Sequence, residues 1–132
     1  MLRYIAVLIL IGSGTSAEAL PPLHKNPTVL GGFYAIGLAD EVRKNCDRIE
    51  PRIFRAYVFL KSLERYARNA GYSSTQIDEL ADNKVEKEKL RHEIRADLAE
   101  RGASPKTPQG YCTVGLEEIA KDSAAGRLLR AR

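Results

Sequence analysis

The chain has 132 residues, of which 44% are hydrophobic and 29% charged, and its formal net charge is +4. This length suits one compact domain and is too short for two well-packed ones. The basic excess is modest and charges of both signs are interleaved, which argues against nucleic-acid binding, as does the lack of a basic and aromatic stacking motif.

The first nineteen residues have the pattern of an export signal. Arg3 gives a positive start, an apolar run follows at 5–11, and Ala17-Glu18-Ala19 has the small-x-small pattern that signal peptidase requires. The apolar run is shorter than the roughly 20 residues of a membrane-spanning helix, so a cleaved signal peptide is favoured over an uncleaved anchor in the inner membrane. We expect residues 1–19 to be removed, by cleavage after Ala19 or after Ala17, and the remainder to be periplasmic.

Export would place the two cysteines, Cys46 and Cys112, in an oxidising compartment, where a disulfide is the usual state. Two cysteines allow one intramolecular pairing, and their separation is too large for a redox C-x-x-C motif. A zinc site is disfavoured because no histidines lie near them in the sequence. The predicted disulfide is therefore structural, and closing a loop of this length is worth about 4 kcal/mol.

Residues 20–27 hold three prolines and are expected to run as an extended arm in front of a single helical domain over 28–132. Asn26 and Pro27 suit a helix cap and first helical position, and apolar residues at helical spacing predict a helix that ends near Cys46. Three glycines weaken its start unless they mark close contact with another helix: Gly31, Gly32 and Gly37.

A second helix is expected to open at Pro51, which suits a first helical turn, and to stop at Gly71, where glycine accepts the left-handed conformation. Its wide apolar stripe predicts the central helix of the fold, with a large buried side. The stripe comprises Ile53, Phe54, Tyr57, Val58, Leu60, Leu63, Tyr66 and Ala67.

Basic residues of this helix fall largely on its polar side. They form either a solvated surface or a face that meets an acidic partner or a membrane surface, and they are the candidate interaction residues. These residues are Arg52, Arg55, Lys61, Arg65 and Arg68.

The region 74–101 is either one helix or two. Ser73 and Gln76 form a capping box, and Asn83 with Glu86 offers a second cap, which favours a short helix followed by a longer one. The longer helix has charges of alternating sign and a narrow apolar stripe, so one thin edge of it should be buried. The stripe comprises Val85, Leu90, Ile94 and Leu98.

Gly102 should end that helix, and residues 103–109 form an irregular connection before a helix that restarts at Thr107-Pro108. Its expected buried face comprises Cys112, Val114, Leu116, Ile119 and Ala120. No stretch alternates apolar and polar residues as a strand does. The sequence thus predicts an all-α fold, a small bundle of four to five helices held by one disulfide.

Catalytic chemistry finds little support. His24 lies on the arm, and His92 shares a helix face with Glu88 at a spacing that a metal site can use, but both histidines are better explained as solvated residues. Haem-attachment, metalloprotease, nucleophile-elbow and phosphate-loop motifs are missing from the sequence. We expect a non-enzyme without cofactor or metal.

Four tyrosines either line a groove between helices or cap the core with their hydroxyls in water: Tyr57, Tyr66, Tyr72 and Tyr111.

Several short segments, in their order along the chain, resemble an uncharacterised family of small exported proteins of Rhodobacter-like bacteria, a domain of unknown function. The segments are Leu20-Pro21-Pro22-Leu23, Arg43-Lys44 before Cys46, Arg65-Tyr66, Gly71-Tyr72-Ser73, Lys84 to Lys87, Cys112, Glu118-Ile119 and Gly126-Arg127-Leu128-Leu129. The resemblance implies a helical periplasmic domain with two bonded cysteines. It implies no activity, cofactor or partner.

We therefore expect a non-catalytic binding or protein-interaction module with an envelope protein as its partner, no nucleic acid, and at most peripheral membrane contact. The alternative is a small periplasmic stress chaperone of the acid-activated helical type. Protonation of carboxylates on the charged helix would then expose apolar surface: Glu86, Glu88, Glu93 and Asp97.

Overall fold

The computed structural model describes Gly14 and residues 19–132, so the expected signal peptide lies almost wholly outside the described residues. Five α-helices make up most of this part of the chain, which confirms the predicted small bundle of four to five helices held by one disulfide. The helices are α1 (Pro27–Asn45), α2 (Ile53–Asn69), α3 (Ser74–Asp82), α4 (Lys84–Glu100) and α5 (Gln109–Ala120).

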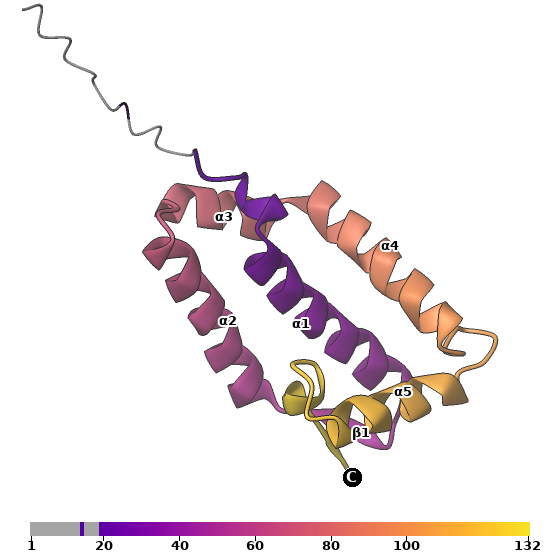
Figure 1. The fold of residues 1–132 in the computed structure, drawn as a ribbon. Helices are drawn as coiled ribbons and strands as arrows, with labels where there is room; N and C mark the ends of the chain where they lie inside the picture. Colours follow the sequence, from indigo (N-terminus) through magenta and orange to yellow (C-terminus); the bar gives the residue numbers. More distant parts are fainter. Residues whose placement is uncertain (1–13, 15–18) are drawn as a thin grey trace, which may run out of the picture.

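α1 is the central helix, a place that the sequence had suggested for α2. It runs between α2 and α4, while α3 crosses near its first residues and α5 packs across its last turns (Figure 1). Most of the buried apolar residues of the main core come from α1, α4, α5 and the C-terminal segment, residues 121–132. α2 therefore has one side on α1 and the other side outside the bundle.

Two glycines of α1 explain how the neighbouring helices approach it. A side chain at Gly32 would collide with Leu63 of α2, and one at Gly37 would collide with Ile94 of α4. These glycines thus mark close helix contact, and Gly31, around which there is open space, does not. The helix starts where predicted, because the Asn26 side chain accepts hydrogen bonds from the backbone N–H groups of residues 28 and 29 at 3.0 and 3.2 Å.

The proline-rich arm is partly folded, contrary to the expectation of an extended segment outside the core. Leu23–Lys25 form a 3₁₀ turn, η1, and Leu23 is buried in a second apolar cluster with Val29 and Ala67. The Tyr72 hydroxyl donates to the carbonyl of Pro21 at 2.6 Å. These contacts tie the start of the described chain to the end of α2.

Residues 74–100 form two helices, as favoured from the two caps. The backbone N–H of Ser73 donates to the Gln76 side chain at 2.8 Å and the N–H of Gln76 donates back to Ser73 Oγ at 3.1 Å. Asn83 caps α4 by accepting from the N–H of Glu86 at 3.0 Å. The narrow stripe of α4 is buried at Ile94 and Leu98, but Val85, in the first turn, is 75% exposed.

A two-stranded antiparallel sheet corrects the prediction that the chain lacks strands. β1 (Ile49–Pro51) pairs with β2 (Leu129–Ala131), with Ile49 opposite Ala131. Pro51 therefore lies in a strand, and α2 begins two residues later than predicted. Each strand has three residues, which is too short for an alternating pattern to be recognised, and a two-stranded sheet offers proline an edge position.

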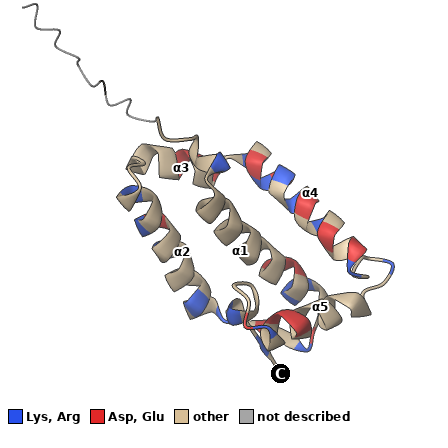
Figure 2. Ribbon diagram, in the orientation of Figure 1, with Lys and Arg blue, Asp and Glu red and all other residues tan. Residues whose placement is uncertain are grey.

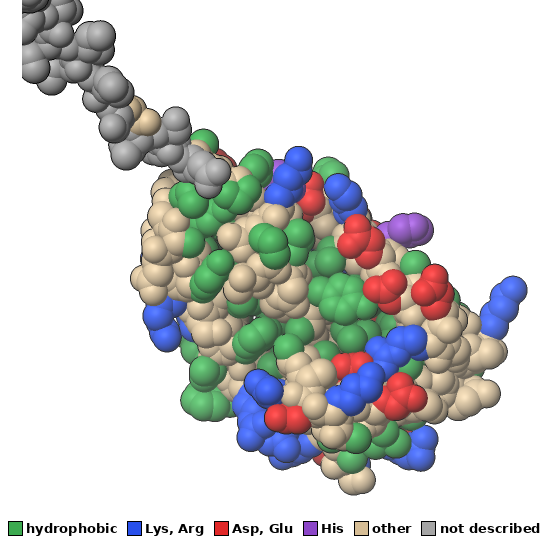
Figure 3. Space-filling model, viewed as in Figure 1, with side chains coloured by type: hydrophobic (Ala, Val, Ile, Leu, Met, Phe, Trp, Pro, Cys, Tyr) green, Lys and Arg blue, Asp and Glu red, His purple; other side chains and the backbone are tan. Residues whose placement is uncertain are grey.

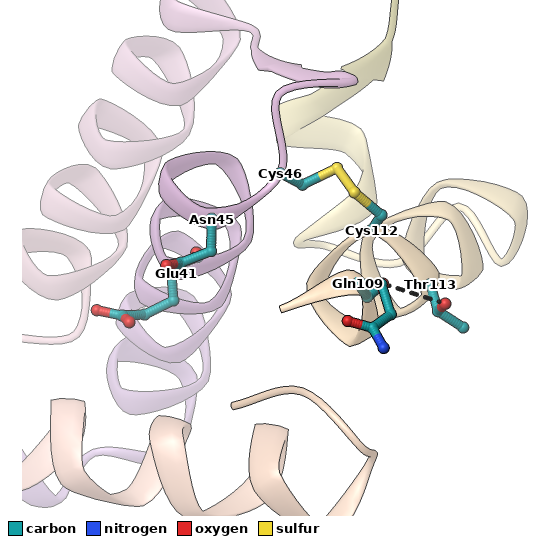
Figure 4. The surroundings of a disulfide bond; sticks show 6 residues. All are labelled: Glu41, Asn45, Cys46, Gln109, Cys112 and Thr113. Atoms are coloured by element: carbon teal, nitrogen blue, oxygen red, sulfur yellow. Dashed lines mark hydrogen bonds between the residues drawn. A yellow bond between two sulfur atoms is a disulfide. The ribbon is translucent and has the colours of Figure 1, made fainter. Parts of the chain in front are cut away.

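The disulfide joins Cys46, directly after α1, to Cys112 in α5, with their Cα atoms 5.2 Å apart (Figure 4). Both cysteines are buried, and Gly115, one turn after Cys112, lies so close to Val42 that a Cβ atom there would meet its side chain at 2.6 Å. The expected buried face of α5 is wrong at Leu116, which is 44% exposed, and at Ala120, which is also exposed. Glu118 is buried instead.

The chain after α5 closes the fold. Ser123 Oγ accepts from the N–H of Gly126, the first residue of the 3₁₀ turn η2 (Gly126–Leu128), at 2.9 Å. Leu128 and Leu129 are buried in the main core. The backbone N–H of Arg52 donates to the carbonyl of Leu128 at 2.7 Å, so the C-terminal segment lies against the start of α2.

Candidate functional site

The outer side of α2 exposes large apolar side chains. We define the apolar patch as the four residues that its first two turns expose: Ile53 (69% exposed), Phe54 (79%), Tyr57 (58%) and Val58 (48%). In the same helix only Leu63 and Ala67 are buried. The prediction that the whole apolar stripe is buried is therefore wrong for its first half and for Tyr66, which is 39% exposed.

Helical spacing brings the members of the apolar patch together. Phe54 and Val58 are four residues apart and lie on one row of the helix surface, and Tyr57 is next to both. The ammonium of Lys61 lies 5.7 Å from the centre of the Tyr57 ring, within the range of a cation–π contact. The apolar patch thus runs directly into the charged half of the helix.

The second half of the outer side is basic. We define the basic patch as Lys61, Arg65 and Arg68, all of which are exposed. Glu64 is the one acidic residue of α2, and its Oε2 atom lies 3.0 Å from Lys61 Nζ and 3.4 Å from an Arg68 guanidinium nitrogen. Within the described part of the chain Arg65 forms no ion pair. The hydrogen bond from Lys61 to Glu64 raises the pKa of Lys61.

The other two predicted interaction residues have a different place. Arg52 is half-buried, and its Nε donates to the carbonyl of Leu129 at 3.1 Å. Arg55 points toward the carbonyl of Arg127, with a donor–acceptor distance of 3.5 Å. Both arginines thus hold the C-terminal segment, so the five predicted residues divide into a structural pair and the basic patch.

The charge of α2 contrasts with that of α4. α2 carries four basic residues and one acidic residue, whereas α4 carries five of each (Figure 2). In the face that Figure 3 shows, most acidic side chains lie toward α4 and α5. α2 therefore has a net positive charge, whereas the charges of α4 balance.

An open hollow of about 700 Å³ lies beside the disulfide, between the end of α1 and the start of α5. Its walls include two cations, Arg43 and Lys44, which are paired with Asp40 at 2.6 and 2.5 Å. Burial alone would raise the pKa of Asp40, but these two hydrogen-bonded cations lower it. The hollow holds no arrangement of nucleophile and base, and the two cysteines beneath it are bonded and buried.

The remaining candidates for chemistry do not come together. His24 lies in η1 and His92 is exposed on α4, where Glu88 pairs with Arg91. No group of three or more potential metal ligands occurs within the described residues. The tyrosines share no groove, because Tyr57 and Tyr66 are exposed and Tyr72 and Tyr111 are buried in separate clusters.

The apolar patch is the feature that sequence reasoning missed. A helix at the surface of a bundle buries a stripe of roughly 100° or somewhat more, and the apolar residues of α2 extend well around the helix beyond that width. An apolar stripe wider than the part that a surface helix can bury is the signal in the sequence that could have indicated an exposed apolar surface. The prediction that α2 is the central helix is wrong, because α1 holds that place.

Comparisons with known proteins place the chain in a family but identify no relative of known function. Within the residues that the structure describes, no helix is both long and apolar enough to cross a membrane. Neither the curated proteins nor the solved structures include a significant match to this chain. A family model described as a family of unknown function, DUF5333, matches residues 21–130, and the chain therefore belongs to that family.

Proposed function

We propose that this protein is a non-catalytic protein-interaction module of the bacterial envelope and that the outer side of α2 is its contact surface. The observation that carries this proposal is the apolar patch, four large adjacent side chains that are 48–79% exposed. Single exposed apolar residues are common, but a contiguous group rimmed by charges is typical of an interaction site.

The composition of the surface supports a protein partner. Aromatic residues and arginine are enriched at protein interfaces, and aromatic side chains often supply most of the binding free energy. The α2 surface offers Phe54 and Tyr57 beside Arg65. The inner side of α2 packs through the buried Leu63 and Ala67 and the partly buried Ala56 and Phe59, so the apolar patch on the outer side has little role in folding.

The location in the periplasm is part of the same proposal. The positive start, apolar run and small-x-small site of residues 1–19 fit a cleaved export signal. A buried disulfide persists in oxidising compartments, and the resembled proteins of Rhodobacter-like bacteria are exported. The alternative of an uncleaved anchor predicts that the protein stays in the membrane fraction when the envelope is extracted with salt.

A photo-crosslinking residue tests the contact surface in cells. It would replace Phe54 in one strain and Val85 in a control strain, because Val85 is as exposed and apolar but lies on α4. We expect one discrete crosslinked product from position 54 and none from position 85. The absence of a product at position 54, or the same products at both positions, would contradict the proposal.

An acid-activated chaperone is the second candidate, and the buried Glu118 favours it. This carboxylate lies 2.8 Å from a guanidinium nitrogen of Arg101 and joins α4 to α5, so its protonation would loosen that junction. The carboxylates first considered for this role lie on the charged helix, mostly exposed: Glu86, Glu88, Glu93 and Asp97. Protection of an aggregating client protein at pH 3 and not at pH 7 would support this candidate.

A further inference from the structure

The outer side of α2 changes from apolar to basic along the helix. The apolar patch occupies the first two turns, and the basic patch begins at Lys61 and ends at Arg68. At a rise of 1.5 Å per residue, Phe54 and Arg65 are about 16 Å apart along the axis. A partner must therefore offer apolar groups at one end and charge at the other end of a segment of about this length.

The charge of that partner follows from the basic patch. The basic patch has three cations and one carboxylate beside them, that of Glu64, which Lys61 and Arg68 already share. Bringing apolar material over the neighbouring patch would remove water from these cations, and desolvated positive charge requires a counter-charge. Carboxylates are the groups on a protein that supply one.

The shape of the surface favours a helical partner. α2 presents a convex side with rows of side chains four residues apart, such as Phe54 with Val58 and Tyr57 with Lys61. Such ridges pack into the grooves of another helix at an interaxial distance of 8–10 Å. A helix of three to four turns would cover both the apolar patch and the basic patch.

A membrane surface fits less well. Near the start of α2 the arginines have partners within the protein, although two of them share one carboxylate: Arg130 and Arg132 lie 3.0 and 3.4 Å from Glu50, and Arg127 lies 3.3 Å from Asp122. Arg52 and Arg55 donate to the backbone carbonyls of residues 129 and 127. A peripheral membrane helix has an apolar face along its length and basic residues on the opposite face. On the outer side of α2 the apolar patch covers only the first two turns, and the basic patch follows it on the same side.

A second copy of the chain fits less well too. Two α2 helices in parallel would bring the two basic patches together, and two in antiparallel arrangement would bury each basic patch against an apolar patch. Neither arrangement supplies the missing negative charge.

We propose that the partner segment is an acidic amphipathic helix, with apolar side chains over Phe54, Tyr57 and Val58 and carboxylates beside Lys61, Arg65 and Arg68. This inference rests on the proposed function and specifies its partner. The apolar groups provide the attraction and the carboxylates fix the direction in which the segment lies on α2.

The test uses a fluorescent 16-residue helical peptide with leucines on one face of its first half and glutamates on the same face of its second half. Its counterpart has lysine in place of every glutamate. The protein is produced from the full chain in an exporting host and purified in its oxidised form. Fluorescence anisotropy should show at least tenfold tighter binding of the acidic peptide, and the difference should shrink at high salt.

Variants then locate the contact. Phe54→Ser and Arg65→Glu should each weaken binding of the acidic peptide at least tenfold. The matched controls on α4, Val85→Ser and Lys89→Glu, should change it less than twofold. Equal binding of both peptides, no binding of the acidic peptide, or an equal effect of the α4 controls would overturn the inference.

Two further measurements decide between the inference and its rivals. Co-sedimentation with vesicles that contain phosphatidylglycerol, abolished by Phe54→Ser, would overturn it in favour of a lipid surface if the acidic peptide does not compete. Sedimentation velocity that shows a Phe54-dependent dimer would overturn it in favour of a second copy. If position 54 still crosslinks one protein in cells while the acidic peptide fails to bind, the proposed function stands and the inference alone fails.

Discussion

Arg101, directly after α4, places a guanidinium nitrogen 2.8 Å from Oε1 of Glu118 on α5. The Glu118 side chain is 9% exposed, and Lys121 Nζ lies 3.7 Å from the same oxygen. Burial alone would raise the pKa of Glu118, but Ser123 and Arg101 outweigh burial and hold the pKa below its usual range. Glu118 is therefore charged at neutral pH and fixes the end of α4 to α5.

This pair makes the stability of the protein sensitive to acid. Because the pKa of Glu118 is lower in the folded state, its stabilising effect is fully present above the unfolded value of about 4.3 and is lost as the pH falls through the folded value. We expect the free energy of unfolding to decrease from about pH 5 downward. Glu118→Gln should flatten this decrease, as urea titrations between pH 3 and pH 7 would measure.

Glu117 provides a matched control for that prediction. It lies 3.0 Å from the same Arg101 but is 51% exposed. At pH 7 we expect Glu117→Gln to change the free energy of unfolding by about 0.5 kcal/mol or less, and Glu118→Gln to lower it by about 1–3 kcal/mol. Equal effects of the two substitutions would mean that burial of Glu118 is not what gives the pair its strength.

The disulfide should supply a large part of the total stability. Cys46 and Cys112 are 66 residues apart, and a crosslink over such a loop is worth about 4 kcal/mol, against 5–15 kcal/mol for a typical domain. The double substitution Cys46→Ser with Cys112→Ser should lower the midpoint of urea unfolding markedly. A reducing agent should do the same to the unchanged protein and should have no effect on the double variant.

Two adjacent glycines of α1 should respond oppositely to alanine. Gly31 faces open space, so Gly31→Ala should stabilise the helix by about 1 kcal/mol or less through higher helix propensity. Gly32 lies against Leu63, so the added methyl group of Gly32→Ala must displace that side chain, at about 1–3 kcal/mol. Thermal unfolding of both variants would measure the contrast, and a gain at both positions would contradict the tight α1–α2 contact.

Local signals made most of the fold predictable. The Asn26 cap, the Ser73 and Gln76 capping box and the glycine stops at 71 and 102 act within a few residues, and the helix ends that they predict lie within two residues of those in the structure. The disulfide followed from the presence of two cysteines. These features need no knowledge of what the helices pack against.

Long-range contacts account for the errors. β1 meets β2 about eighty residues later in the chain, as the ion pair between Glu50 and Arg130 illustrates, and three-residue strands carry no pattern of their own. The exposure of Phe54 depends on which side of α2 meets α1, and the wide apolar stripe did not distinguish the two sides. Arg52 likewise could be recognised as structural only after Leu129 was placed beside it.

The different roles of the two sides of α2 can be measured with one pair of substitutions. Leu63 is buried against α1, so Leu63→Ala should lower the free energy of unfolding by about 2–5 kcal/mol. Phe54 is 79% exposed, so Phe54→Ala should change it by about 0.5 kcal/mol or less. Urea unfolding at several protein concentrations would compare them. A loss at Phe54 as large as that at Leu63, at every concentration, would mean that the apolar patch is covered by the chain itself, and α2 would then have no free surface for a partner.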